Sequence, residues 1–467
     1  MAYKDANQVH PYIPNTVPEV QEEMLKDIGV DSLDDLFKAI PNELKYNKKL
    51  NIPDALTEIE LKKDIDRTMA KNISTDDVIS FLGGGVWEHY IPAVCDEVNQ
   101  RAEFLTAYAG DEYEDHGRFQ ALFEYQSLVA ELVDMDVVNV PTFDWAQAAA
   151  TSIRMASRIK GRYEVLIPKT ISPERLRIIN NYCSPDVKCV LVDYNKKTGQ
   201  LNLDDLKEKI SNRTAAVYFE NPSFLGFIEK YSKEISEIAK QNGAISIVGV
   251  DPSSLGVLEP PVNYGADIVC GELQPLGIRM NYGGGLSGFI ATKDEIEFVQ
   301  EFPSRLFGIS PTSKEGEYGF GDVLFDRTSL ISREKGKESV GTQTSMWGLT
   351  AGVYLALMGP KGMEELGQSI MQRSQYAMKE LESIEGVTAS RFGDMNFKEF
   401  VVDFNDTGKK VKEINKILRK EGIFGGIDLS KDFPELGQCA LYCVTEVHSQ
   451  SDIDKLVSAI NNIKEQK

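Results

Sequence analysis

The stretch "GADIVCGELQPLGIRMNYGGG", residues 265–285, shows how the central part of this chain is built. It begins with a short apolar run, "ADIVCGE", which predicts a strand. Glu272, Leu273 and Gln274 then fill a turn, and three glycines follow at 283–285. The next apolar run, "GLSGFIAT", predicts another strand. The stretch is therefore interpreted as part of a sheet, with a polar turn and a glycine-rich loop between two strands.

The sequence before this stretch alternates predicted strands with predicted helices. "DVVNV" precedes a helix expected at 146–159, and "YEVLIP" precedes one at 173–182. "VKCVLVDY" is followed by "LNLDDLKEKI", "TAAVYFENP" by "YSKEISEIAKQNG", and then comes "AISIVGVD". Repeated strand–helix–strand units need crossover connections, which give a mostly parallel sheet covered on both faces. The pattern predicts a large α/β domain over 69–330.

Three further regions flank this domain. Residues 1–68 are expected to form a charged helical arm, with helical spacing in "VPEVQEEMLKDIG" and "SLDDLFKAI". Residues 331–364 are interpreted as a polar connector, "SREKGKESVGTQTS", followed by a helix, "TAGVYLALMG". Residues 365–467 predict a smaller α+β domain, entered through an amphipathic helix near 361–384. A helix is also predicted in "FQALFEYQSLVAEL", with one apolar face made by Phe119, Leu122, Phe123, Val129 and Leu132.

The overall composition narrows the class of partner. The chain has 467 residues, with 51 basic and 72 acidic side chains, and a net charge of −21. Such an acidic surface disfavours nucleic acid and anionic membranes. No stretch approaches the roughly 20 apolar residues of a membrane span. The first residues do not form a secretory signal, and the six cysteines are scattered, so we expect a cytoplasmic protein.

Two glycine runs and the possible metal ligands have plain structural interpretations. "GGGLSG" has the G-x-G-x-x-G spacing, but a strand follows it where a dinucleotide site needs a helix, so a turn with close backbone approach is favoured. Residues 83–85, "GGG", are expected to be a flexible loop, or alternatively to line a site. The four histidines are far apart, and four residues of strand would separate Cys439 from Cys443 by roughly 13 Å. No metal site is therefore predicted.

Two polar residues are candidates for a functional role. His116 lies in "YAGDEYEDHGR" with Asp111, Glu112, Glu114, Asp115 and Arg118, a charge run that is either solvated surface or the surroundings of a proton carrier. Asp251 ends the strand "AISIVGVD". It could cap the following turn, or it could face a ligand at the carboxyl edge of the sheet.

These features together bring a known family into view. The chain resembles subunit 1 of the two-subunit glycine dehydrogenase (decarboxylating), the P-protein of the glycine cleavage system. The resemblance runs nearly end to end and is specific in "YIPNT" (12–16), "HYIPAV" (89–94), "EFLTAY" (103–108), "QALFEYQ" (120–126), "ENPSFLGFIE" (220–229), "GGGLSGFIAT" (283–292) and "VYLALMGPKG" (353–362). It implies the fold-type I architecture of pyridoxal-phosphate enzymes, with a mostly parallel sheet in the large domain and a smaller C-terminal α+β domain.

The resemblance also suggests why the turn at 272–274 holds no lysine. In this family the second (β) subunit carries the lysine that binds pyridoxal phosphate, and subunit 1 has lost it. Here the first lysine after Asp251 is Lys293, beyond the next expected strand. Without a lysine amine at that turn the chain cannot hold the cofactor covalently there. Asp251 is then a vestige of the cofactor site, and no covalent cofactor is expected on this chain.

Three segments depart from the family pattern. "FDWAQA" (143–148) places Trp145 where small residues usually let backbone amides approach a phosphate, so Trp145 either obstructs that approach or packs in the core. The loop at 109–118 and the segment at 336–344 are also altered. In the family both lie near a cleft shared by the two subunits. The resemblance therefore suggests Tyr108, His116, Arg333 and Lys335 as the residues closest to that cleft.

The sequence leaves three functions open. In the first, the chain is the subunit without the lysine in a glycine decarboxylase, and it works with the β subunit and a lipoyl carrier, the H-protein. In the second, a diverged paralogue acts with a pyridoxal-phosphate-bearing partner on a different amino acid. In the third, the chain is a catalytically silent scaffold.

Overall fold

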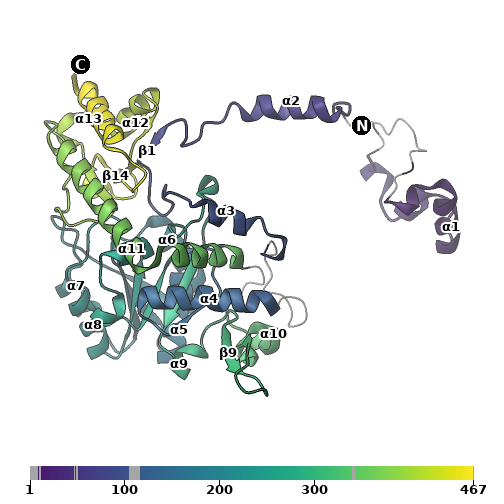
Figure 1. Ribbon diagram of the computed structural model, residues 1–467, viewed down its shortest axis with the longest axis horizontal. Helices are drawn as coiled ribbons and strands as arrows, with labels where there is room; N and C mark the ends of the chain where they lie inside the picture. The colour runs from purple at the N-terminus through teal and green to yellow at the C-terminus, as the bar shows by residue number, and fades with distance from the viewer. Residues whose placement is uncertain are drawn as a thin grey trace. The chain divides into compact units, whose positions relative to one another are not determined.

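The computed structural model describes residues 9, 12–46, 48, 51–104, 116–338 and 343–465. It divides into two compact units, Met1–Ser74 and Thr75–Lys467, which are described separately (Figure 1).

The first unit is a series of short helices. It contains η1 (Pro14–Thr16), α1 (Pro18–Ile28), η2 (Leu33–Phe37), η3 (Asn42–Leu44) and α2 (Glu58–Met69). A reciprocal capping box between Thr57 and Glu60 starts α2. The helix expected in "VPEVQEEMLKDIG" is confirmed, whereas "SLDDLFKAI" forms only a five-residue 3-10 helix. None of the described residues in this unit is buried, so its helices have no core of their own.

The second unit is built on a seven-stranded sheet with the order β2-β8-β7-β6-β5-β3-β4. The strands are β2 (Val137–Val138), β3 (Glu164–Pro168), β4 (Lys188–Val192), β5 (Thr214–Glu220), β6 (Ile245–Val250), β7 (Ile268–Glu272) and β8 (Gly288–Thr292). The ladder from β4 to β7 is parallel, and β8 and β2 are added antiparallel at one edge. The predicted mostly parallel sheet is therefore confirmed.

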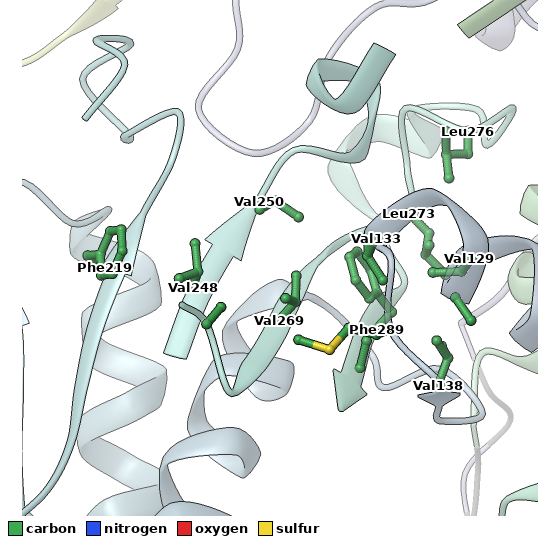
Figure 2. Packing of buried hydrophobic residues seen from close by; sticks show 14 of the residues in the cluster. Val129, Val133, Val138, Phe219, Val248, Val250, Val269, Leu273, Leu276 and Phe289 are labelled. Carbon is green, nitrogen blue, oxygen red and sulfur yellow. The ribbon is translucent and has the colours of Figure 1, made fainter. Parts of the chain in front are cut away.

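Helices cover both faces of this sheet. They are α3 (Ala93–Asn99), α4 (His116–Val133), α5 (Trp145–Lys160), α6 (Pro173–Cys183), α7 (Leu203–Lys209), α8 (Ser232–Gln241) and α9 (Ile296–Val299). Alternate residues along a strand belong to different hydrophobic core clusters. Val248 and Val269 belong to the same cluster as residues of α4 and α8, and Ile247 and Ile268 to the same cluster as residues of α5 and α6. Figure 2 shows the first cluster. Burial on both faces explains why the strands are continuously apolar.

The helix α4 is buried more widely than its sequence predicts. Phe119, Leu122 and Val129 are in the core, but Phe123 and Leu132 are only half-buried. Other buried residues on this helix are Tyr125, Gln126, Ala130 and Val133. The five predicted residues all pack against core clusters, and further sides of α4 are buried as well, because the helix contacts α11 (Ser345–Glu382), β2 and the hairpin of β9 (Phe307–Pro311) and β10 (Tyr318–Asp322). The sequence analysis did not predict this hairpin.

The C-terminal part forms a second, smaller α/β layer. After α10 (Ser329–Ser332), α11 is interrupted at Gly359, with φ 60°, and Pro360, so the two helices predicted here are present on either side of a kink. The strands β11 (Glu399–Asp403), β14 (Cys439–Cys443) and β13 (Ile427–Asp428) form an antiparallel sheet, and β1 (Ile79–Ser80) pairs with β12 (Ile423–Phe424). The helices α12 (Val411–Lys420) and α13 (Gln450–Glu465) complete the layer. Among the described residues no helix is long and apolar enough to cross a bilayer.

Candidate functional site

The candidate site lies at the carboxyl edge of the parallel strands. β5 ends at Glu220, β6 leads directly into Asp251, and β7 ends at Glu272. The helix α5 begins at Trp145, whose backbone N–H donates to Glu272. Open α/β sheets bind ligands at this edge, often beside a helix N-terminus.

The turn after β7 is filled by two buried polar side chains. Glu272 accepts hydrogen bonds from the backbone N–H groups of Trp145 (3.0 Å), Gln274 (3.2 Å) and Ser287 (2.5 Å). Burial nevertheless raises the pKa of Glu272 to about 8. The amide of Gln274 accepts from the N–H of Trp87 and donates to the carbonyl groups of Trp87 and Ile278. These side chains hold the backbone of the turn together, which is a structural role.

The first lysine after Asp251 is far from this turn. Lys293 is exposed and follows β8, which runs antiparallel to β7. Because Thr292 pairs with Ile268 at the start of β7, Lys293 lies at the opposite edge of the sheet from Glu272. It has no access to the carboxyl edge.

Trp145 and Arg175 fill the space above the ends of β5 and β6. Trp145 is buried, and the Arg175 guanidinium lies 3.7 Å from the centroid of its ring. Arg175 Nη1 is 2.5 Å from Glu220 Oε1, which also accepts a hydrogen bond from the Tyr218 hydroxyl (2.9 Å). Trp145 thus packs in the core, and its backbone N–H donates to Glu272 of the same chain.

Asp251 caps the following turn, which is one of the two roles that its sequence position suggested, and it also faces a lysine of the same chain. Its Oδ1 accepts from the Ser253 N–H (3.0 Å) and hydroxyl (2.7 Å), which caps the following turn. Its Oδ2 is 2.6 Å from the Lys398 ammonium, and the side chains of Asp251 and Lys398 are 7% and 2% exposed. The charged group that Asp251 faces therefore belongs to the same chain.

Lys398 has further partners and was missed by the sequence analysis. Its Nζ lies 3.2 Å from His89 Nε2 and 3.6 Å from the Trp87 ring centroid. On the other side of the imidazole, His89 Nδ1 is 2.8 Å from Glu446 Oε2. The only local signal is a lysine in the largely apolar run "NFKEFVVDF", residues 396–404, which is consistent with an ordinary strand edge.

His89 lies between a carboxylate and an ammonium group. Its Nδ1 faces Glu446 and its Nε2 faces Lys398. Burial works to raise the pKa of Glu446, but His89 and the N–H of Tyr90 together hold it at about 2. The result is a row of four polar groups: the Glu446 carboxylate, the His89 imidazole, the Lys398 ammonium and the Asp251 carboxylate.

Little space remains around Asp251 for a ligand. The cavity there measures about 20 Å³ and is lined by Gly84, Trp87, Trp145, Arg175 and Lys398, among others. That volume holds about one water molecule. The pyridoxal phosphate implied by the resemblance does not fit among these residues. Gly84 and Gly85 of the loop at 83–85 line this cavity, and the Gly84 N–H donates to Glu399.

The other residues predicted for the site lie elsewhere or outside the described residues. Tyr108 falls outside them. His116 is the first residue of α4, and only its backbone is described. Arg333 and Lys335 belong to the exposed η9 (Arg333–Lys335), and neither lines the Asp251 cavity.

Two residues from the altered segments, Arg118 and Glu338, bind to other side chains of this chain. Arg118, expected in a polar loop, is buried because α4 begins at His116, and it donates to Ser345 Oγ at 2.7 Å. Glu338 lies 3.1 Å from Arg154 and 2.7 Å from Arg158. The charge of Glu338 is thus balanced by two neighbours on α5.

Comparison with known proteins defines the family. A family model described as the glycine cleavage system P-protein matches residues 10–460. The chain belongs to the glycine cleavage system P-protein family. A relative from Staphylothermus marinus, named probable glycine dehydrogenase (decarboxylating) subunit 1, is 40% identical, with 97% of this chain and 98% of the relative covered. A relative of the same name from Pyrococcus horikoshii is 38% identical over 97% and 99%.

Solved structures agree with this P-protein assignment. A crystal structure of glycine decarboxylase (P-protein) of the glycine cleavage system, in inhibitor-bound form, superposes with a TM-score of 0.85 at 31% identity, covering 98% of this chain and all of that one. A sphingosine-1-phosphate lyase from Burkholderia pseudomallei superposes with a TM-score of 0.65 at 12% identity, covering 91% and 95%, which supports the fold alone. The expected fold-type I architecture is confirmed.

Proposed function

We propose that this P-protein chain is the subunit of a two-subunit glycine decarboxylase that does not hold the cofactor. The names of its relatives, "subunit 1", imply a second subunit. In this proposal the second subunit carries pyridoxal phosphate on a lysine, and a lipoyl carrier protein receives the aminomethyl group. The cofactor supplies an electron sink for decarboxylation in that subunit. The cytoplasmic location stays a prediction.

The observation that carries this proposal is the closed carboxyl edge of the sheet. Glu272 and Gln274 occupy the turn after β7, and Lys398 pairs with Asp251. The remaining cavity of about 20 Å³ is too small for the cofactor. A chain with this fold and a filled site is suited to supporting the catalytic subunit and to forming walls of a shared cleft.

The test reconstitutes the enzyme from its separate parts. Borohydride reduction in the presence of pyridoxal phosphate should label a lysine of the second subunit and leave this chain unlabelled. Glycine-dependent CO₂ exchange should require both subunits and the lipoyl carrier. A labelled lysine on this chain would refute the proposal.

The residues proposed to face the shared cleft can be tested in the same assay. Arg333 and Lys335 are exposed cations suited to attracting a carboxylate substrate. We expect the double substitution Arg333→Ala/Lys335→Ala to lower kcat/KM about 10-fold, which corresponds to roughly 1.4 kcal/mol. Lys361→Ala is the matched control, since Lys361 is 88% exposed and paired only with Glu365 at 3.9 Å. Equal effects of the two changes would remove Arg333 and Lys335 from the site.

The same reconstitution distinguishes the two other functions that the sequence leaves open. Turnover with another amino acid, but not glycine, would show a diverged paralogue. No turnover with any amino acid once both partners are present would show a scaffold.

A further inference from the structure

The Lys398 ammonium is a buried cation that is surrounded by groups of this chain. It has three N–H donors. The carboxylate of Asp251 lies at 2.6 Å, the imidazole of His89 at 3.2 Å, and the face of the Trp87 ring at 3.6 Å. A carboxylate and an aromatic face both stabilise an ammonium group, and the imidazole lies beside it.

The partners of Lys398 come from separate parts of the fold. Asp251 follows β6 of the seven-stranded sheet, whereas Lys398 immediately precedes β11 of the small sheet. His89 belongs to the segment between β1 and α3, and Glu446 follows β14. The backbone also fixes Lys398 in place, because its carbonyl accepts from the Val444 N–H at 2.8 Å. The ammonium is therefore positioned by the docking of the small sheet onto the large one.

In enzymes that use pyridoxal phosphate, a carboxylate at this edge of the sheet pairs with the protonated ring nitrogen of the cofactor. In this chain Asp251 already has a cation of its own. We propose that Lys398 is an internal substitute for a bound organic cation, and that removing its side chain creates a site for a small alkylammonium ion opposite Asp251. This inference rests on the proposed function only in assigning the cofactor to the other subunit.

The first test measures thermal stability of the full isolated chain. Lys398→Met keeps most of the side-chain volume but leaves the buried Asp251 carboxylate without a cation. Removing one partner of a buried pair is strongly destabilising, so we expect Tm to fall by about 3–5 °C. Adding Asp251→Asn removes the unpaired charge and should restore at least half of that loss. The matched control is Lys169→Met. Lys169 pairs with Asp193 at 3.1 Å, but both of these side chains are about 40% exposed. The Tm of this variant should therefore differ from that of wild type by less than about 2 °C.

The second test uses chemical rescue. Lys398→Ala removes three carbons and the nitrogen, which together have the shape of propylammonium. Millimolar propylammonium should raise the Tm of this variant by several degrees, and propan-1-ol, which has the same size but no charge, should not. Wild type and Lys169→Ala should show no response to propylammonium.

Each outcome decides the inference. It is overturned if Lys398→Met is as stable as wild type, if propan-1-ol rescues Lys398→Ala as well as propylammonium does, or if Lys398→Met/Asp251→Asn is no more stable than Lys398→Met alone. If Lys398→Ala does not fold without additive, expression and refolding in propylammonium replace the Tm measurement, and failure there counts against the proposal. None of these readouts involves the second subunit, so they are independent of whether glycine is the substrate.

Discussion

The pair formed by Arg175 and Glu220 offers a direct test of how the carboxyl edge of the sheet is filled. Arg175 and Glu220 are 6% and 4% exposed, with Nη1 and Oε1 2.5 Å apart, and the guanidinium lies on the Trp145 ring. Arg175→Met keeps an unbranched stem of similar length but removes the charge. It leaves Glu220 buried with only the Tyr218 hydroxyl as a donor.

The expected cost follows from these contacts. Breaking a buried ion pair by removing one partner costs about 3–5 kcal/mol. Losing the guanidinium from the aromatic ring adds roughly 1 kcal/mol, and the remaining Tyr218 hydrogen bond offsets a similar amount. We therefore expect Arg175→Met to lower the free energy of unfolding by about 4 kcal/mol. In Arg175→Met/Glu220→Gln the buried charge is gone, so the double variant should be at least about 2 kcal/mol more stable than the two single losses predict.

The measurement is urea unfolding followed by tryptophan fluorescence, because Trp145 lies under the guanidinium, with far-UV circular dichroism as a second probe. Arg177→Met is the matched control: Arg177 is on the same helix, 71% exposed and 3.8 Å from Glu174, so its loss should cost less than about 0.5 kcal/mol. A cost below about 1 kcal/mol for Arg175→Met, or strictly additive losses in the double variant, would refute the reasoning.

Two further predictions concern other parts of the same region. The folded-state pKa of Glu446, about 2, is below its ordinary value of 4.5, so its ionised form stabilises the fold above about pH 4.5, and this contribution is lost as the pH falls towards 2. Glu446→Gln should therefore be less stable than wild type by roughly 3 kcal/mol at pH 7, and the difference should shrink in unfolding curves measured at successively lower pH. Gly226→Ala should cost more than about 3 kcal/mol in urea unfolding, because at φ 90° a Cβ would lie 2.1 Å from the Glu399 carbonyl oxygen. The control is Gly393→Ala, which has a similar φ of 99° but nothing within 4 Å of the added Cβ, and it should cost only about 1 kcal/mol. Equal losses in the two variants would show that the cost of Gly226→Ala comes from backbone strain and not from the clash.

Local patterns were sufficient for much of the fold. Strands such as β6 and β7 are continuously apolar because both of their faces are buried, and that pattern can be identified without knowing what covers them. The amphipathic helix α6 and the break at Gly359 and Pro360 are likewise local features. The apolar pattern of α4 identified only part of its buried surface, because the burial of a helix depends on how many elements pack against it.

The sequence by itself determined the family, the mostly parallel sheet and the absence of a lysine from the turn at 272–274, since each of these can be found in contiguous residues. Only the tertiary structure decided which side chains fill the carboxyl edge of the sheet. It brings Lys398, from the edge of the small sheet, onto Asp251, and it places Arg175 on Trp145. Such contacts join residues far apart in the chain, and whether a charged side chain finds its partner depends on how the layers dock, which no local pattern of polarity records.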